Sequence, residues 1–311
     1  MGVIEDEIPA TPPVPGTQMD VVADKRAARR EKAILFFKSP SALIGLAIIL
    51  FWVICAVLGA RITPFDPFST DGLSHEAPFV NGYYFGTDQL GRDVLSRIML
   101  GARDVLIAAP LAAIIGVVSG SMLGLLMGYY RGILDDVLGR LIEAFLVLPL
   151  TLVGLLALAA APDDWSIIPG IESSTQTVIL VVGLLFTPIV ARTVRAAVLA
   201  ERENDYVQAA KLRGENGLYI MTREILPNVM SPIVVEFTVR IGYAIFAIAT
   251  LSFLGVGIQE PTPDWGLMIA QEYRLVIGGY WWVTVFPALA IASLVIAVNL
   301  IADRLQEVME L

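Results

Sequence analysis

Long apolar segments separated by polar stretches dominate the chain. Six of them are long enough to cross a bilayer, because about 20 apolar residues span its hydrocarbon core. They lie near Ser41–Ala60, Asp104–Tyr130, Leu141–Ala161, Thr177–Leu199, Ser231–Val256 and Trp281–Ile301. The pattern predicts an all-α fold, a polytopic membrane helix bundle with about six transmembrane helices.

The composition supports this prediction. The chain has 311 residues, of which 56% are hydrophobic and only 16% charged, and its mean hydropathy is +0.73. A soluble domain carries about 25% charged residues. The net charge of −9 comes from acids in the tail and the loops, so it is no argument for a cationic partner. We expect a lipid bilayer around the chain and no nucleic-acid partner.

Residues 1–23 are rich in proline, threonine and acids, which predicts a disordered tail rather than a signal peptide. Residues 24–40 are first basic and then aromatic, and suit an amphipathic helix lying at the membrane interface. A plain positively charged flank of the first span is the alternative. Residues 41–103 hold the first span and a long external loop, and residues 104–311 form the core of the bundle.

Lysine and arginine are distributed unevenly between the two sides of the predicted bundle. Cytoplasmic loops carry the excess of such residues. One side carries Lys25, Arg26, Arg29, Arg30, Lys32, Lys38, Arg131, Arg140, Arg192, Arg195, Arg202, Lys211, Arg213, Arg223 and Arg304. The other side carries Arg61, Arg92, Arg97, Arg103 and Arg274. The first side is therefore predicted to be cytoplasmic, with both termini on it.

The residues that usually carry catalysis or bind metal are scarce. Cys55 is the single cysteine and lies in an apolar run, so it has no partner for a disulfide. His75 is the single histidine and belongs to no HExxH motif, so we expect no metal site. The chain contains no Gly-Lys dipeptide and hence no Walker A loop. If ATP drives this protein, another chain binds it.

The second span carries a glycine at every fourth position, namely Gly116, Gly120, Gly124 and Gly128. This spacing places bare backbone on one helix face, where a second membrane helix can pack closely. In the fifth span, Glu236 and Arg240 are spaced for an ion pair within one helix. Four spans contain a proline within them or at an end, namely Pro110, Pro149, Pro188 and Pro287. Kinks at these prolines could act as hinges or could only shape the bundle.

A polar stretch, residues 204–228, separates the fourth and fifth spans. Asn204 or Asp205 can cap a helix over residues 206–213, which Gly214 ends in a left-handed conformation. Ala209 and Ala210 give that helix a thin face for close approach. A second short helix follows over residues 218–225, and Pro227 ends it by pushing the preceding residue out of the α region.

This stretch resembles the EAA loop of ABC-transporter permeases, which docks as a coupling helix into the ATP-hydrolysing subunit. The family pattern is Glu-Ala-Ala, three residues, Gly, then Ile-Leu-Pro. Gln208 stands here in place of the usual glutamate. The resemblance implies ATPase-coupling roles for Tyr206, Gln208, Ala209, Ala210, Lys211, Gly214 and Pro227.

A second motif lies in the external loop, where residues 85–97 read F-G-T-D-Q-L-G-R-D-V-L-S-R. The residues alone predict a structured loop before an amphipathic helix on the membrane face. The stretch is similar to a signature of permeases for dipeptides, oligopeptides and nickel. The resemblance makes this signature a candidate contact for a binding protein; a purely structural role, bracing the loop, is the alternative. Its residues are Gly86, Thr87, Asp88, Gly91, Arg92 and Asp93.

Together the two resemblances imply a type I ABC importer permease in the bacterial inner membrane. Such a subunit makes no covalent chemistry and holds no cofactor, because partner ATPase subunits bind ATP and Mg²⁺. The implied partners are a second homologous permease, two ATPase subunits or domains and an extracytoplasmic substrate-binding protein. The expected substrate is a di- or oligopeptide; nickel, glutathione, opines or oligosaccharides stay open.

Two other classes of function agree less well with the sequence. A secondary transporter working alone usually keeps acids or bases at the membrane midplane, whereas the middles of the six predicted spans carry none. An integral membrane enzyme would need a cluster of acids, histidine or cysteine at one depth, and the sequence offers none.

The predicted topology can be tested by labelling single cysteines introduced at Ser173 and at Asn216, in a background lacking Cys55. The distribution of positive charge places Ser173 outside and Asn216 inside. A membrane-impermeant thiol reagent added to intact cells should therefore label only the cysteine at position 173. Labelling of both positions from one side would rule out the topology.

Overall fold

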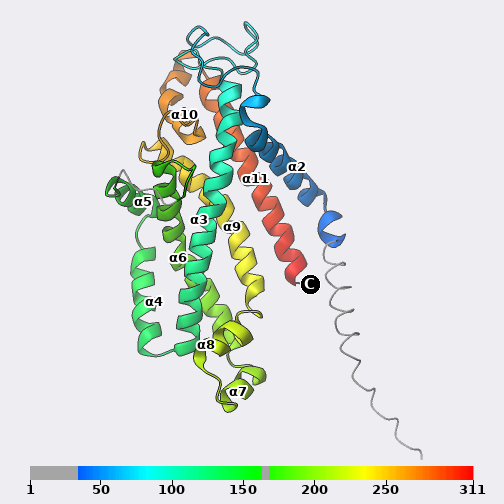
Figure 1. The fold of residues 1–311 in the computed structure, drawn as a ribbon, viewed down its shortest axis with the longest axis vertical. Helices are drawn as coiled ribbons and strands as arrows, with labels where there is room; N and C mark the ends of the chain where they lie inside the picture. The colour runs from blue at the N-terminus through cyan, green and yellow to red at the C-terminus, as the bar shows by residue number, and fades with distance from the viewer. Residues whose placement is uncertain (1–33, 163–167, 311) are drawn as a thin grey trace, which may run out of the picture.

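The computed structural model describes residues 34–162 and 168–310. The described part is an elongated bundle of helices with no strand (Figure 1). The predicted tail, residues 1–23, and most of the predicted interfacial helix, residues 24–40, lie outside the described residues. Residues 34–37 are helical, and Arg304 donates a hydrogen bond of 2.8 Å to the Leu35 carbonyl.

Within the described residues, five helices are long and apolar enough to cross a membrane, and there are six such segments if a bent pair of helices counts as one span. The five are α2 (Pro40–Leu58), α3 (Val94–Tyr130), α6 (Ser173–Glu201), α9 (Met230–Phe253) and α11 (Trp282–Glu310). The bent pair consists of α4 (Ile133–Leu146) and α5 (Leu150–Ala159). The predicted all-α polytopic bundle is therefore confirmed.

The shorter elements lie at the two ends of the bundle (Figure 1). One end holds α7 (Asp205–Leu212), α8 (Gly217–Tyr219) and a π-helical turn, η2 (Ile220–Ile225). The opposite end holds the 3₁₀ turn η1 (Gly59–Arg61), the loop of residues 62–93, and α10 (Trp265–Glu272) with the 3₁₀ turn η3 (Tyr273–Gly278).

The predicted third span, near Leu141–Ala161, is a bent pair of helices, with the break at the proline where the sequence predicts a kink. The axes of α4 and α5 meet at 91°, and the break falls on residues 147–149. Pro149 cannot donate an intrahelical hydrogen bond, so the helix restarts with this proline as the N-cap of α5. The proline-containing helices α3, α6 and α11 continue through Pro110, Pro188 and Pro287.

The second span begins ten residues earlier than the hydropathy predicts, at Val94 instead of Asp104. Asp93 caps this start, because its carboxylate accepts hydrogen bonds from the Ser96 N–H and hydroxyl. The amphipathic helix expected on the membrane face is thus the first part of α3. Hydropathy alone missed it because Arg97, buried here, and Arg103 lower the apolar character of these turns.

Close packing between α3 and α6 forms the centre of the bundle. Gly116, Gly120, Gly124 and Gly128 are buried on the face of α3 that meets α6. A Cβ added at Gly120 would lie 2.6 Å from the Val190 Cβ, and one at Gly124 would lie 2.8 Å from the Ala191 carbonyl oxygen. The predicted role of the glycines in helix packing is confirmed.

The ion pair within the fifth span is also confirmed. Arg240 donates two hydrogen bonds to the same carboxylate oxygen of Glu236, one from Nε at 2.9 Å and one from Nη2 at 2.7 Å. The guanidinium carbon lies 5.8 Å from the ring centre of Phe186 and 5.3 Å from that of Tyr243. Pairing and aromatic contact lower the cost of holding the charge in a membrane helix.

The close packing predicts that even alanine is harmful on the α3 ridge. In a Gly120→Ala, Gly124→Ala double variant the helices must separate, and overpacking of this kind costs about 1–3 kcal/mol. Gly139→Ala on α4 is the matched control, because the nearest atom to its new Cβ would be Met127 Cε at 3.9 Å. Thermal unfolding of the purified protein should show a lower midpoint for the double variant only. Equal midpoints would contradict close packing.

Candidate functional site

The loop between α6 and α9 begins with α7, whose end is closed by backbone hydrogen bonds. The Glu215 N–H donates to the Ala210 carbonyl at 3.3 Å, and the Gly214 N–H to the Lys211 carbonyl at 3.0 Å. This pair of bonds is a Schellman motif, which requires a left-handed residue. Gly214 supplies it with a φ of +82°. The predicted glycine stop is therefore confirmed.

Two details of the predicted loop are wrong. Asn204 occupies the N-cap position of α7, but its side chain donates to the Glu201 carboxylate instead of capping the helix. Leu226 keeps α-helical angles, φ −52° and ψ −45°, although it precedes Pro227. Its N–H donates to the Met221 carbonyl five residues back, so the π turn carries the backbone helically up to the proline.

The inner face of α7 belongs to the core of the bundle. Val207 and Ala210 are completely buried, together with Ile220 and Ile225 of the second short helix, in one cluster that includes Val198 of α6. The two alanines therefore do not share one face: Ala210 packs inside the loop, and Ala209 is exposed. An outside surface can reach only Ala209, because successive helical residues point about 100° apart.

Polar contacts fasten the same loop to the ends of the spans. The Tyr206 hydroxyl donates to the Glu201 carboxylate and accepts from Asn228 Nδ2 at 3.0 Å. Burial, together with the neighbouring carboxylate, raises the pKa of Tyr206 to about 12, so the phenol stays a protonated donor near neutral pH. Gln208 Nε2 donates to the Arg202 carbonyl at 3.1 Å. The loop and the spans thus form one packed unit.

The outer face of α7 lacks any cover within the described residues. Leu212 is 90% exposed, and Ala209 lies one turn before it on the same face. Lys211 is half-buried, and Pro227 is exposed at the other end of the loop. Sequence reasoning missed Leu212, although its i+3 spacing from Ala209 and its opposition to the buried Ala210 could have identified it.

The signature residues of the loop before α3 are not placed on an exposed surface, as a contact with a binding protein would require. All six, Gly86, Thr87, Asp88, Gly91, Arg92 and Asp93, are buried. Gly86 and Gly91 have φ angles of +75° and +77°, and a side chain at either would collide with the backbone of Glu76 or Gly72. This burial favours the second of the two predicted roles, a brace within the loop, which stays a prediction.

Asp88 is the centre of this brace. Its carboxylate accepts from the backbone N–H groups of Leu90 and Arg92 at 2.9 Å, and from Arg92 Nε at 2.6 Å. Arg97, 1% exposed, lies 3.8 Å away from the same carboxylate. Arg92 also reaches Glu260 at 3.3 Å, before α10. Asp88 and Arg92 therefore form a buried ion pair that extends to Glu260, distant in sequence, whereas Asp93 takes no part in it and caps α3 instead.

A second carboxylate ties the loop to α10. Glu272 accepts from the Gln89 N–H at 2.9 Å with one oxygen, and its other oxygen lies 3.0 Å from His75 Nε2. The single histidine is therefore engaged in a contact between loop and helix. Neither Glu260 nor Glu272 was identifiable from the sequence, because each lies more than 160 residues from its partner in the loop.

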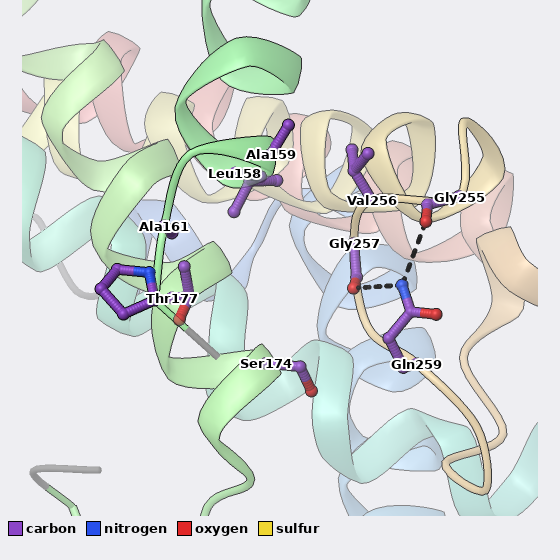
Figure 2. A pocket seen from close by; sticks show the side chains of 10 residues that line it. Leu158, Ala159, Ala161, Ser174, Thr177, Gly255, Val256, Gly257 and Gln259 are labelled. Atoms are coloured by element: carbon purple, nitrogen blue, oxygen red, sulfur yellow. Dashed lines mark hydrogen bonds between the residues drawn. The ribbon is translucent and has the colours of Figure 1, made fainter. Parts of the chain in front are cut away.

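A cavity of about 290 Å³ lies near this end, between the end of α5, the start of α6 and the loop after α9 (Figure 2). Within the lining, Gln259 Nε2 donates hydrogen bonds to the Gly255 carbonyl at 3.2 Å and to the Gly257 carbonyl at 3.0 Å. Ser174 and Thr177 contribute hydroxyl groups to the lining. Among the residues that the structure describes, the lining includes no charged side chain.

The fold defines a polytopic helical membrane protein, and its packed loop leaves Ala209 and Leu212 of α7 exposed. Residues 120–310 match the family model of the binding-protein-dependent transport system inner membrane component. Residues 32–78 match the N-terminal transmembrane domain of oligopeptide transport permease C. The chain belongs to this family of inner-membrane transport components and is a multi-pass permease.

Several curated relatives extend over nearly the whole chain. The dipeptide transport system permease protein DppC of Haemophilus influenzae is 35% identical over 88% of this chain and 92% of its own. The di/tripeptide transport system permease protein DppC of Pseudomonas aeruginosa is 34% identical over 88% of this chain and 89% of its own. The glutathione transport system permease protein GsiD of Pectobacterium atrosepticum is 33% identical, over 94% of each chain.

The brace around Asp88 predicts a large effect from a small substitution. Asp88→Asn removes the charge that faces two buried arginines, and breaking a buried ion pair costs about 3–5 kcal/mol. Asp71→Asn, an exposed change in the same loop, is the control and should alter stability by less than about 0.5 kcal/mol. Limited proteolysis from the outer side should cut the loop faster in the first variant only. Equal cutting rates would show that the cluster is not a brace.

Proposed function

We propose that this chain is one of two permease subunits of an ATP-driven importer of peptides. The main support is α7, whose inner face is packed into the core while Ala209 and Leu212 remain uncovered on its outer face. Single exposed leucines are common on protein surfaces, so the support for docking is the position of Leu212 on a helix whose sequence resembles the coupling helix of ABC-transporter permeases. An ATPase subunit seated there would move the packed loop, and with it α6 and α9.

In this proposal the α7 end is cytoplasmic, as are both chain termini. ATP binding closes a pair of ATPase subunits, and the loop transmits that motion to the spans of this chain and of a homologous second permease. A binding protein docks at the opposite end and delivers the substrate. This chain performs no covalent chemistry and needs no cofactor, because ATP and Mg²⁺ are held by the partner subunits.

Peptides are the proposed substrate because the curated relatives carry peptides in their names, including dipeptides and tripeptides. A glutathione permease among the relatives fits the same class, since glutathione is itself a tripeptide. Nickel, opines and oligosaccharides receive no comparable support. Peptide uptake by proteoliposomes containing the whole importer, supplied with ATP inside and loaded binding protein outside, tests this assignment.

The coupling role predicts that charge on the outer face of α7 will release the ATPase. Leu212→Glu should leave the permease folded, because the side chain is 90% exposed. Burying an unpaired carboxylate in the docking surface would cost several kcal/mol, enough to lower the amount of co-purifying ATPase at least tenfold. Leu73→Glu, at a leucine 71% exposed at the opposite end, is the matched control.

Comparing Ala210→Glu with Leu212→Glu distinguishes an effect on ATPase docking from an effect on folding of the loop. This residue is buried inside the loop, so a glutamate there should lower the stability of the permease itself. Leu212→Glu should lower only ATPase retention and substrate-stimulated hydrolysis. Full retention of ATPase by Leu212→Glu would show that α7 is not the coupling helix.

A further inference from the structure

A second cavity, of about 310 Å³, lies between α3, α4 and α6 in the half of the bundle nearer α7. Its volume is at the lower end of the roughly 300–1,000 Å³ found for small-molecule sites. Six charged side chains line it: Asp135, Asp136, Arg140 and Glu143 from α4, and Arg192 and Arg195 from α6. The cavity therefore differs sharply in chemistry from the uncharged one in Figure 2.

Two of the six charged groups form a direct ion pair. Arg195 holds Asp135 in a two-pronged ion pair, with Nε and Nη2 at 2.5 and 2.7 Å from the two carboxylate oxygens. Within the described residues, the other four side chains have no hydrogen bond or ion pair. All four are exposed: Asp136, Arg140, Glu143 and Arg192. Two cations and two anions are thus left available around one cavity.

The three faces of α4 explain this arrangement. Asp135 and Ile142 are buried toward α3 and α6, and Ile133, Val137 and Leu141 form an exposed apolar face. Asp136, Arg140 and Glu143 share the remaining face at spacings of four and three residues. Unpaired charge on a membrane-spanning element is costly unless it is hydrated or paired. The charged face must therefore border water or a ligand that carries charges of its own.

We propose that this cavity binds the two termini of a short peptide on its way through the bundle, an inference that rests on the proposed function. Arg192 would hold the terminal carboxylate, because a guanidinium matches a carboxylate with two parallel hydrogen bonds. Glu143 and Asp136 would hold the α-ammonium group. Arg195 is one helical turn from Arg192 and stays occupied by Asp135. The site recognises the charges that all free peptides share, so peptides with different side chains can use it.

A cysteine in the cavity reports its occupancy. Gly139 lines the cavity, and a Cβ there would meet only Met127 Cε, at 3.9 Å. The experiment uses Gly139→Cys in a Cys55→Ala background, within the complete importer in nanodiscs and without binding protein. Dialanine should slow maleimide labelling of this cysteine several-fold at saturation. N-acetyl-dialanine amide, which lacks both charges, should leave the rate unchanged.

Arginine variants then identify the group that holds the carboxylate. Arg192→Gln should abolish the protection by dialanine, and Arg192→Lys should retain part of it, because lysine keeps the charge but loses the paired hydrogen bonds. Arg61→Gln, an exposed arginine at the opposite end of the bundle, should retain full protection.

Three outcomes would overturn the proposal: equal protection by dialanine and its blocked analogue, unchanged protection in Arg192→Gln, or no protection by dialanine. A cysteine that never reacts, with or without peptide, would also overturn it, because the second permease would then fill the cavity. Peptide uptake by the intact importer is measured separately. Uptake without protection would reject this site alone, whereas protection without uptake would reject the proposed function and leave the site standing.

Discussion

The contact between α3 and α6 is the constraint on which the rest of the structure depends. Lipid offers apolar surface as readily as a neighbouring helix does, so membrane helices gain little from hydrophobic contact and need close approach instead. The glycines at 116, 120, 124 and 128 allow that approach along four turns of α3. Because α3 is 37 residues long, roughly 55 Å, one rigid pair of helices extends to both ends of the bundle.

One end of this helix pair carries the signature of residues 85–97, and the other end carries the loop of residues 204–228. At the start of α3, Asp93 caps the helix and Arg97 joins the buried cluster around Asp88, which ties the loop before α3 to the segment before α10. At the end of α6, Glu201 and Arg202 hold the loop that contains α7. A displacement of α7 is therefore transmitted to α6 directly, through packed side chains and hydrogen bonds. This continuity is the physical basis of the proposed coupling.

Membership of the transport family and the cavity between α4 and α6 suggest different tasks for different parts of the chain. The rigid pair of α3 and α6 provides the frame, whereas α4 lies at the periphery, bent by 91° from α5 (Figure 1). The Asp135–Arg195 ion pair is the main polar tie between α4 and this frame. The remaining charges on α4 are left free, which is what a passage for charged molecules requires.

The sequence by itself determined the number of crossings, the glycine ridge, the Glu236–Arg240 pair and the glycine stop at Gly214. These features depend on residues close together in the chain, and hydrophobic length and helical spacing report them directly. Only the tertiary structure decided that Ala210 is buried while Leu212 is exposed, and that Glu260 and Glu272 complete the brace around the signature. Those outcomes depend on which distant segment packs against each face, and local periodicity carries no information about that partner.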